Sequence, residues 1–222
     1  MNMDEDERLI VKSWANDHGI QLSAQQLELL DIYLNEVSEW NKHINLIGVS
    51  SRQRIINELL LDSLMPASFL PQKGRLLDLG SGGGFPAIPL KICIPGLKFH
   101  LVESNRKKVN FLKHVIRITR LENIEVLSGR IEEERGQLWT DGYNAVTARA
   151  VADLSRTMTW CAPHLIAGGL FVNFQGNCFE SAVQKSSDIL EKEHIALFKS
   201  IPYRLPGKKG SERNLLVFIK NK

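Results

Sequence analysis

The chain has 222 residues, of which 43% are hydrophobic and 24% charged, and its formal net charge is +3. This composition is ordinary for a soluble globular protein of one domain, or of one domain with an extension. No apolar run approaches the roughly 20 residues of a membrane helix, and the acidic start of the chain lacks the apolar core of a secretory signal. Cys93, Cys161 and Cys178 form neither a disulfide framework nor a metal-binding pattern. We therefore expect a cytoplasmic protein with no membrane contact and no metal.

The first seventy residues have the spacing of helices. One helix is expected from Asp4 to about His18. A second begins after Ser23, because Gln26 three residues later completes a capping-box pattern. The apolar residues of this second helix recur every three or four positions: Leu27, Leu30, Leu34, Val37 and Trp40.

A third helix is expected to begin at Ser50 or Ser51 and to continue through Ile55 and Leu59 to Met65. Residues 1–72 would then form an N-terminal helical extension. We expect this extension to pack on a second unit, residues 73–222, which carries the ligand site.

Predicted strands and helices alternate from Arg75 onward, which indicates a mostly parallel sheet with helices on both faces. The predicted strands are 75–79, 98–103, 124–128, 143–148, 168–174, 195–201 and 214–220. The predicted helices are 86–94, 105–120, 153–162 and 178–193. No helix separates the last two strands, so the segment 206–211 is expected to join them in an antiparallel hairpin.

A glycine-rich stretch follows the first strand: Asp78-Leu79-Gly80-Ser81-Gly82-Gly83-Gly84-Phe85-Pro86. Its alternate glycines let the backbone turn sharply and approach a ligand closely. Phe85 stands where the dinucleotide fingerprint has its third glycine, so that fingerprint fits poorly. The pattern instead resembles motif I of the class I methyltransferases, which bind S-adenosylmethionine.

Acidic residues follow the next two strands. In an open α/β sheet the ligand binds beyond the carboxyl ends of the strands. Glu103 ends the second strand, where an acceptor for ribose hydroxyls is expected; the alternative is a Glu that caps the next helix. After the third strand, Ile131 can lie against an adenine ring and Glu132 can accept from its amine, or Glu132 can simply start an exposed helix.

Two more charged residues stand at strand ends. Asp78 can order the glycine loop by accepting backbone N–H bonds, or it can cap a helix. Arg149, after the fourth strand, can hold a carboxylate or phosphate bidentately. The alternative for Arg149 is a surface salt bridge.

No residue stands out as a general base. The chain also lacks the Asn-Pro-Pro-Tyr, Pro-Cys, Tyr-x-x-x-Lys and Gly-x-Ser-x-Gly patterns of other chemistries. A nitrogen with a free lone pair, such as guanine N7, needs no deprotonation before it attacks a sulfonium methyl. Catalysis then needs alignment and electrostatic support.

Nearly the whole chain resembles the glucose-inhibited division protein B family, the small-subunit ribosomal RNA (guanine-N7)-methyltransferases. The resemblance rests on the glycine stretch with Ile88-Pro89-Leu90 and on these further elements: Trp40-Asn41 with Asn45-Leu46, Leu61-Asp62-Ser63, Lys108-Val109-Asn110-Phe111-Leu112 and Arg149-Ala150. It implies a class I methyltransferase fold: a Rossmann-like, seven-stranded, mostly parallel sheet with a C-terminal antiparallel hairpin.

The resemblance also implies the activity, which is transfer of a methyl group from S-adenosylmethionine to N7 of a guanine in 16S ribosomal RNA, at position 527. S-adenosylhomocysteine is the product. The residues expected to bind the cofactor are Asp78, Gly80, Gly82, Phe85, Glu103, Ile131, Glu132 and Arg149. Arg149 is also the residue expected to position the reactants and to act electrostatically in catalysis.

Three positions depart from the family pattern. Ala87 stands where Gly is usual, Leu59 where a His commonly precedes Leu-Asp-Ser, and Gln175 where a Lys is usual. The last two concern contacts with the substrate rather than with the cofactor.

Basic residues are unevenly placed. Residues 1–60 carry five Lys and Arg against ten Asp and Glu, whereas the remainder carries 23 against 15. This excess permits a polyanionic partner. By the family resemblance we expect a monomer that binds 16S RNA or a small-subunit particle. The phosphate contacts are expected at Arg106, Lys107, Lys113, Arg117, Lys208 and Lys209. The alternatives are a methyltransferase of a small molecule or protein, and a binding protein that has lost catalysis.

Overall fold

The computed structural model describes residues 3–132, 138–207 and 212–222. Within these ranges seven strands form one sheet in the order β3-β2-β1-β4-β5-β7-β6, and β7 runs antiparallel to both of its neighbours. The strands are β1 (Gly74–Leu79), β2 (Leu97–Glu103), β3 (Ile124–Ser128), β4 (Tyr143–Ala148), β5 (Leu165–Gln175), β6 (Ile195–Arg204) and β7 (Glu212–Lys220). The predicted seven-stranded, mostly parallel sheet with its antiparallel C-terminal pair is confirmed.

Helices precede the sheet and connect its strands. Before β1 come α1 (Glu5–Asp17), α2 (Ala24–Asn41), α3 (Arg52–Arg54), the π-helical segment η1 (Ile55–Leu60), α4 (Leu61–Leu64) and the 3-10 segment η2 (Met65–Ser68). After β1 come α5 (Ala87–Cys93), α6 (Arg106–Thr119), α7 (Leu154–Cys161), η3 (Ala162–His164), α8 (Glu180–Lys185) and α9 (Ser187–Lys192). In the described part of the chain no helix is long and apolar enough to cross a bilayer.

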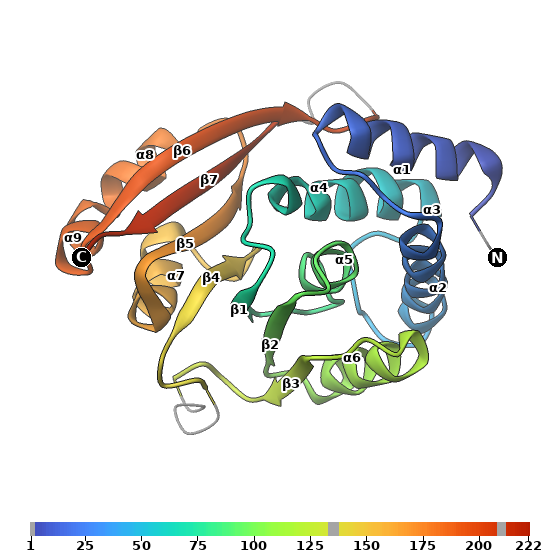
Figure 1. Ribbon diagram of the computed structural model, residues 1–222, viewed down its shortest axis with the longest axis horizontal. Coiled ribbons are helices and arrows are strands. Elements are labelled where there is room, and N and C mark those ends of the chain that lie inside the picture. The colour runs from blue at the N-terminus through green and yellow to red at the C-terminus, as the bar shows by residue number, and fades with distance from the viewer. Residues whose placement is uncertain (1–2, 133–137, 208–211) are drawn as a thin grey trace.

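The sheet is covered on both faces (Figure 1). The helices α2, α4, α5 and α6 lie on one side, and α7, α8 and α9 lie on the other. Side chains alternate along β1, so that Leu76 joins the hydrophobic cluster on the first side and Leu77 the cluster on the second. The first cluster also contains Leu30 and Leu34 of α2. The N-terminal helices therefore share a core with the sheet.

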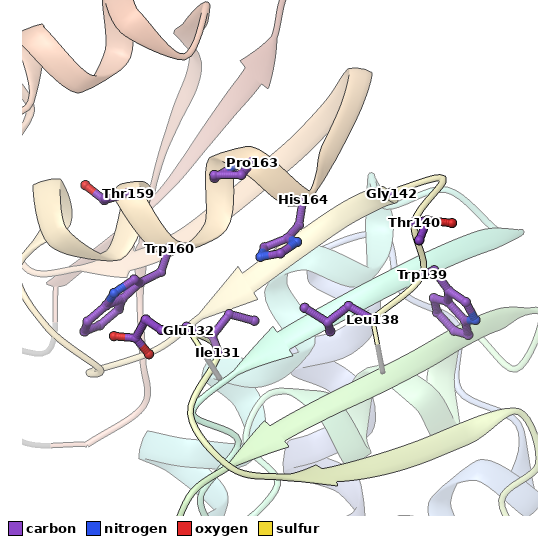
Figure 2. A pocket seen from close by; sticks show the side chains of 10 residues that line it. All are labelled: Ile131, Glu132, Leu138, Trp139, Thr140, Gly142, Thr159, Trp160, Pro163 and His164. Carbon is purple, nitrogen blue, oxygen red and sulfur yellow. The ribbon is translucent and has the colours of Figure 1, made fainter. Parts of the chain in front are cut away.

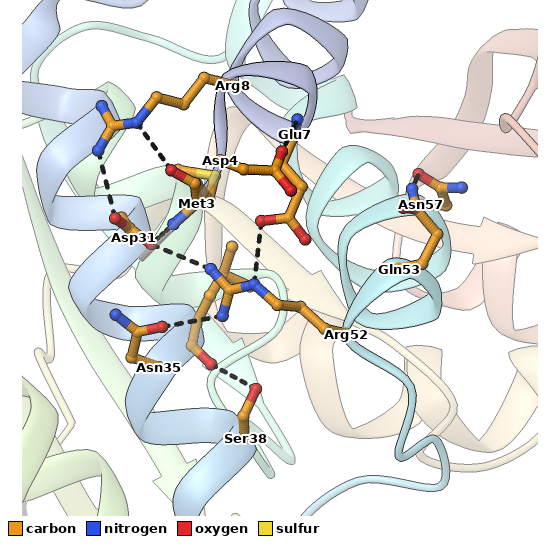
Figure 3. Close-up of polar contacts among 11 residues, drawn as sticks. Met3, Asp4, Glu7, Arg8, Asp31, Asn35, Ser38, Arg52, Gln53 and Asn57 are labelled. Carbon is orange, nitrogen blue, oxygen red and sulfur yellow. Dashed lines mark hydrogen bonds and ion pairs between the residues drawn. The ribbon is translucent and has the colours of Figure 1, made fainter. Parts of the chain in front are cut away.

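A buried carboxylate ties the three N-terminal helices together (Figure 3). Asp31 of α2 pairs through Oδ1 with Arg52 Nη2 at 3.0 Å and through Oδ2 with Arg8 Nη2 at 3.2 Å. Arg52 Nε also donates to Glu7 Oε2 at 3.0 Å. The network fixes α1 and α3 against α2.

The second and third helices begin where the sequence predicts, but one of the two lacks the expected side-chain cap. The Ser23 hydroxyl and the Gln26 side chain form the expected capping box. Ser51 occupies the N-cap of α3, but its side chain makes no cap hydrogen bond. The third predicted helix is continuous in space but passes through the π-helical turn η1, which hydrophobic spacing alone does not reveal.

Several elements have bounds that differ from those predicted. Strand β5 begins at Leu165, three residues before the expected start at 168. The helix expected over 178–193 is split into α8 and α9 at Ser186, whose hydroxyl donates to the Ala182 carbonyl at 2.8 Å. Strand β6 continues through Pro202 to Arg204, beyond the expected end at 201. An edge strand tolerates proline because one of its sides needs no N–H donor.

Candidate functional site

The loop between β1 and α5 is a tight turn with open space above it. Gly80, Gly82 and Gly84 have φ of 68°, 54° and 88°, which glycine adopts without strain. The N–H groups of Gly80 and Ser81 both donate to the Val102 carbonyl, at 2.9 and 3.1 Å. A Cβ on Gly82 would meet nothing nearer than the Gly80 carbonyl oxygen, at 3.7 Å. A ligand can therefore approach the backbone at this point.

The carboxylate of Glu103 joins the loop to the start of α6. Its Oε2 accepts the Gly82 N–H at 2.8 Å, and its Oε1 accepts the Asn105 N–H at 2.7 Å. The cap of α6 is Asn105, whose side chain accepts from two backbone N–H groups of the first turn, so the helix-cap alternative for Glu103 is wrong. Each carboxylate oxygen keeps acceptor capacity. Glu103 can therefore still receive hydroxyl groups of a ligand.

A cavity of about 310 Å³ lies beside this loop, at the carboxyl ends of β1, β2 and β3 and next to α7. It is lined by Leu79, Gly80, Val102, Glu103, Ser104, Gly129, Arg130, Ile131, Glu132, Val151, Ala152, Arg156 and Trp160. The structure thus brings four of the predicted site residues together: Gly80, Glu103, Ile131 and Glu132.

A larger cavity of about 590 Å³ adjoins the first (Figure 2) and shares Ile131, Glu132 and Trp160 with it. Figure 2 shows the Trp160 ring beside the Glu132 carboxylate, and Trp139 stands on the opposite side of this cavity. Its lining contains no residue of the glycine loop. We therefore assign the ligand site to the smaller cavity, which the loop and Glu103 border.

Asp78 lies beneath the loop, but its carboxylate does not accept the loop N–H groups as predicted. The register of β1 and β4 places Asp78 opposite Thr147, whose hydroxyl donates to Asp78 Oδ1 at 2.6 Å. The other oxygen, Oδ2, has no hydrogen-bond partner among the described residues. The loop N–H groups go instead to Val102 and Glu103. Burial raises the pKa of Asp78 to about 6.

Helix α2 contacts the glycine loop through a residue that does not line the cavity. The hydroxyl of Tyr33, a buried residue of α2, donates to the Gly83 carbonyl at 2.6 Å. Burial raises the pKa of Tyr33 well above its ordinary value. The Phe85 ring packs against Tyr33 with a centroid separation of 5.1 Å and does not line the cavity.

The segment that follows α2 covers the same loop. Asn41 Oδ1 accepts the N–H groups of Leu46 and Ile47, at 3.1 and 2.9 Å. A Cβ on Gly83 would lie only 2.8 Å from Ile47 Cγ2. The predicted extension therefore touches the loop directly.

Arg149 follows β4 and lies outside the cavity lining. Its Nε pairs with Asp62 Oδ2 at 3.1 Å, and its Nη2 donates to the Glu58 carbonyl at 3.0 Å. The guanidinium carbon lies 5.9 Å from the Phe174 ring centroid. The partner Asp62 is 2% exposed, so the ion pair is buried, unlike the surface salt bridge named as the alternative.

The expected basic face is exposed where the structure describes it. Arg106, Lys107, Lys113 and Arg117 are exposed on α6. This helix starts two residues after Ser104, which lines the cavity. Lys208 and Lys209 lie outside the described residues.

The family model GidB, described as rRNA small subunit methyltransferase G, matches residues 26–216. The chain belongs to the GidB family. A relative from Syntrophobacter fumaroxidans, ribosomal RNA small subunit methyltransferase G 1, is 38% identical over 91% of this chain and 92% of its own length. A Geobacter protein named ribosomal RNA small subunit methyltransferase G is 33% identical over 96% of this chain and 97% of its own. The resemblance predicted from the sequence is confirmed.

Solved structures share the fold of this GidB chain at low sequence identity. The O-methyltransferase TomG from Streptomyces achromogenes, solved with SAM, aligns with a TM-score of 0.61 and 16% identity over 99% of this chain and 100% of its own. TYW2 of M. jannaschii, solved with AdoMet, gives 0.60 and 15% over 78% of this chain and 77% of its own. These likenesses confirm the class I methyltransferase fold.

Several residues of this site carry no local signal in the sequence. Trp160 and Arg156 reach the cavity from α7, and Thr147 reaches Asp78 from β4. Tyr33 reaches the loop from α2, far away in the chain. The spacing of Arg156 and Trp160, four residues apart in a predicted helix, is a signal that could have placed both on one face.

Proposed function

We propose that this protein transfers a methyl group from S-adenosylmethionine to N7 of a guanine in 16S ribosomal RNA. The observation that carries the proposal is the carboxylate of Glu103, which holds the open turn at Gly82 and lines the adjoining cavity. Membership of the GidB family supports both the donor and the acceptor. The second product is S-adenosylhomocysteine.

The described residues fit an adenosyl group. Glu103 would accept the ribose hydroxyls, Ile131 would lie against the adenine ring, and Glu132 would accept from its amine. Gly80, Gly82 and Phe85 would offer backbone groups, and Arg149 would contact the polar end of the cofactor. Asp78 supports the loop from below through its main-chain carbonyl, which accepts the Ser81 hydroxyl at 3.2 Å, and its Oδ2 is buried without a partner among the described residues. When bound, S-adenosylmethionine supplies a methyl group on a positively charged sulfur.

Methyl transfer to guanine N7 requires the protein mainly to hold the two reactants in the correct orientation. Guanine N7 carries a free lone pair, so no side chain has to remove a proton from it. The glycine turn admits a ligand against bare backbone, and Tyr33 and Ile47 keep that turn rigid. Fixed geometry of this kind lowers the barrier by holding the reacting atoms in line. Fixed charges around them stabilise the charge that moves to the base.

The substrate would approach along α6. The exposed side chains of Arg106, Lys107, Lys113 and Arg117 would contact phosphates of the RNA. Guanine N7 lies in the deep major groove of an RNA helix, so the target belongs in a loop or an opened junction. In this proposal residues 1–72 are the extension that braces the glycine loop, residues 73–222 form the cofactor-binding unit, and the protein acts as a cytoplasmic monomer.

The direct test is methyl transfer from labelled S-adenosylmethionine to two substrates, naked 16S RNA and small subunits, both from cells that lack this protein. We expect one guanine N7 to be methylated in at least one substrate, at position 527. Absence of transfer to both, or transfer to a different atom, would overturn the proposal.

The RNA-binding face has a separate test. Replacing Lys113 and Arg117 by Glu should weaken RNA binding and reduce the dependence of affinity on salt, because fewer counterions are released. Lys192→Glu on α9, on the opposite side of the sheet, is the matched control and should leave both unchanged. If the Lys113/Arg117 variant and the Lys192 variant changed RNA affinity equally, α6 would not be part of the RNA interface.

A further inference from the structure

Arg149 is held directly by the segment formed by η1 and α4, and indirectly by β6. Its Nε pairs with Asp62 of α4, and its Nη2 donates to the main-chain carbonyl of Glu58 in η1. Asp62 in turn accepts a hydrogen bond from the hydroxyl of Tyr203 in β6. The cluster thus joins the N-terminal helices, the end of β4 and an edge strand.

The cluster lies beside the assigned cavity rather than in its lining, since Val151, two residues after Arg149, is part of that lining. Arg149 directly follows β4, next to β1 in the centre of the sheet, and ligands of open α/β sheets bind beyond the carboxyl ends of such strands. The charge of Arg149 also reaches the base of the glycine loop. Burial raises the pKa of both Asp78 and Tyr33, and the Arg149 charge acts against both increases.

Stability alone is a weak reason for such a cluster. The Asp62 side chain is 3% exposed and that of Arg149 is 16% exposed, so both charges are largely removed from water. A buried ion pair of this kind contributes little net stability compared with apolar residues of similar volume. What the pair does supply is a fixed orientation for the guanidinium, since charge-assisted hydrogen bonds are strong and directional.

The backbone at Glu58 is also unusual. The helix passes through the π-helical turn η1 at this point, a rare conformation that occurs frequently at functional sites. The Glu58 carbonyl of this turn is the oxygen that receives Arg149 Nη2. The π turn therefore contributes an acceptor to the arginine.

One nitrogen of Arg149 is left over. Nε and Nη2 are both bonded within the protein, and Nη1 donates to no acceptor among the described residues. An arginine tied by two of its nitrogens has little freedom left, and its third nitrogen can donate to a ligand at low entropic cost.

We infer that Asp62 and Tyr203 are positioning residues of the methyl-transfer site, which fix Arg149 so that its Nη1 faces the reactants. The inference rests on the proposed function of Arg149 and adds two residues to it. Asp62 holds the guanidinium directly, and Tyr203 holds the Asp62 carboxylate. Neither residue touches the reacting atoms.

The test compares variants of this cluster with matched buried controls. Asp62→Asn and Tyr203→Phe remove the charge and the hydroxyl. Asp31→Asn is the control for the acid, since Asp31 is also a buried, doubly paired Asp. Tyr143→Phe is the control for the phenol, because its buried hydroxyl bonds to His100 Nδ1 at 2.8 Å.

Two readouts are needed. The first is the Nε–H signal of Arg149 in protein labelled with ¹⁵N-arginine, identified by its loss in Arg149→Lys. It should exchange slowly with water in the wild type, quickly in Asp62→Asn, at an intermediate rate in Tyr203→Phe, and as in the wild type in both controls. A rapidly exchanging signal in the wild type, or an unchanged one in Asp62→Asn, would overturn the inference.

The second readout is kcat/KM for methyl transfer to RNA. We expect Asp62→Asn to lower it by about 10- to 100-fold, Tyr203→Phe by less, and the controls by less than about twofold even where they lower Tm. Combining Asp62→Asn with Arg149→Lys should cost no more than the more damaging single change, because residues that act through one another are not additive. The inference would be refuted if the fold-losses in kcat/KM of the two single variants multiplied in the double variant, or if Asp62→Asn kept the wild-type kcat/KM. An inactive wild type would instead refute the proposed function. If Asp62→Asn does not fold, Tyr203→Phe is tested instead. An Nε–H exchange rate and a kcat/KM equal to those of the wild type in that variant would refute the inference.

Discussion

Glu103 is the residue whose replacement most directly tests the cofactor site. Glu103→Gln keeps the shape of the side chain but removes its charge and one of its two acceptor oxygens. The carboxylate accepts N–H groups from both Gly82 and Asn105, so one of them must lose its partner. The change therefore acts on stability and on ligand binding together.

The two effects can be sized from these contacts. A buried N–H left without a partner costs about 1–3 kcal/mol, which for a chain of this length lowers Tm by about 2–12 °C. A hydrogen bond from a ribose hydroxyl to a charged acceptor contributes about 1.5–3 kcal/mol. Its loss should therefore weaken binding of S-adenosylmethionine by about 10- to 150-fold.

Calorimetric titration of S-adenosylmethionine measures the affinity, and thermal unfolding measures the stability. Asn105→Ala is the matched control, because it removes the side-chain cap of α6 at a cost of about 1 kcal/mol and leaves the Glu103 carboxylate in place. It should lower Tm without a comparable loss of affinity. If Glu103→Gln bound the cofactor as tightly as the wild type, the assignment of this carboxylate to the ribose would be wrong.

Three further predictions concern the surroundings of the loop. Because the pKa of Asp78 is raised by burial to about 6 from an ordinary value near 3.9, the folded state holds this proton more tightly than the unfolded state, and stability should fall as pH rises between these values. Between pH 4 and pH 7, urea unfolding should show the wild type losing about 2 kcal/mol of unfolding free energy relative to Asp78→Asn, and an equal pH dependence of the two proteins would contradict burial as the cause. Gly83→Ala should lower Tm, because the new methyl group would force Ile47 away. Adding Ile47→Ala should recover part of that loss. If the Tm of the double variant fell by the sum of the two single losses, the contact would be unimportant. Arg52→Met should destabilise the chain by about 1–3 kcal/mol in urea unfolding, because a charged hydrogen bond to buried Asp31 is lost, while cofactor affinity stays unchanged.

The regular part of the fold follows closely from sequence pattern. The strands of the parallel sheet are short apolar runs between helices, and each was predicted to within a few residues. The splitting of the last helix at Ser186 was missed, since it depends on a local hydroxyl-to-carbonyl bond that competes with the helix. The π-helical turn was missed because its spacing of apolar residues does not differ enough from that of an α-helix.

The site was predictable only where it follows the chain closely. Glu103 was found because it ends a strand after the glycine turn, and Ile131 and Glu132 because they follow the next strand. Asp78 was predicted to accept the loop N–H groups, and its actual partner Thr147 was missed, since strand register decides that Thr147 stands opposite it. No local pattern shows register between strands separated by helices.

Contacts between distant segments were out of reach for the same reason. The hydrogen bond from Tyr33 to the Gly83 carbonyl joins residues 50 positions apart, and the one from Tyr203 to Asp62 joins residues 141 positions apart. Nothing near either tyrosine in the sequence distinguishes it from an ordinary core aromatic residue. Only the folded arrangement shows that Tyr33 bonds the Gly83 carbonyl of the loop and that Tyr203 bonds the carboxylate that pairs with Arg149.

The bond between Tyr203 and Asp62 also has a consequence for biosynthesis. Asp62 and Arg149 emerge from the ribosome well before the strand that carries Tyr203. The Asp62 carboxylate can therefore gain its last hydrogen-bond partner only when translation is almost complete. A nascent chain that ends before β6 would already hold the Asp62–Arg149 ion pair but not the phenol that completes the shell of Asp62.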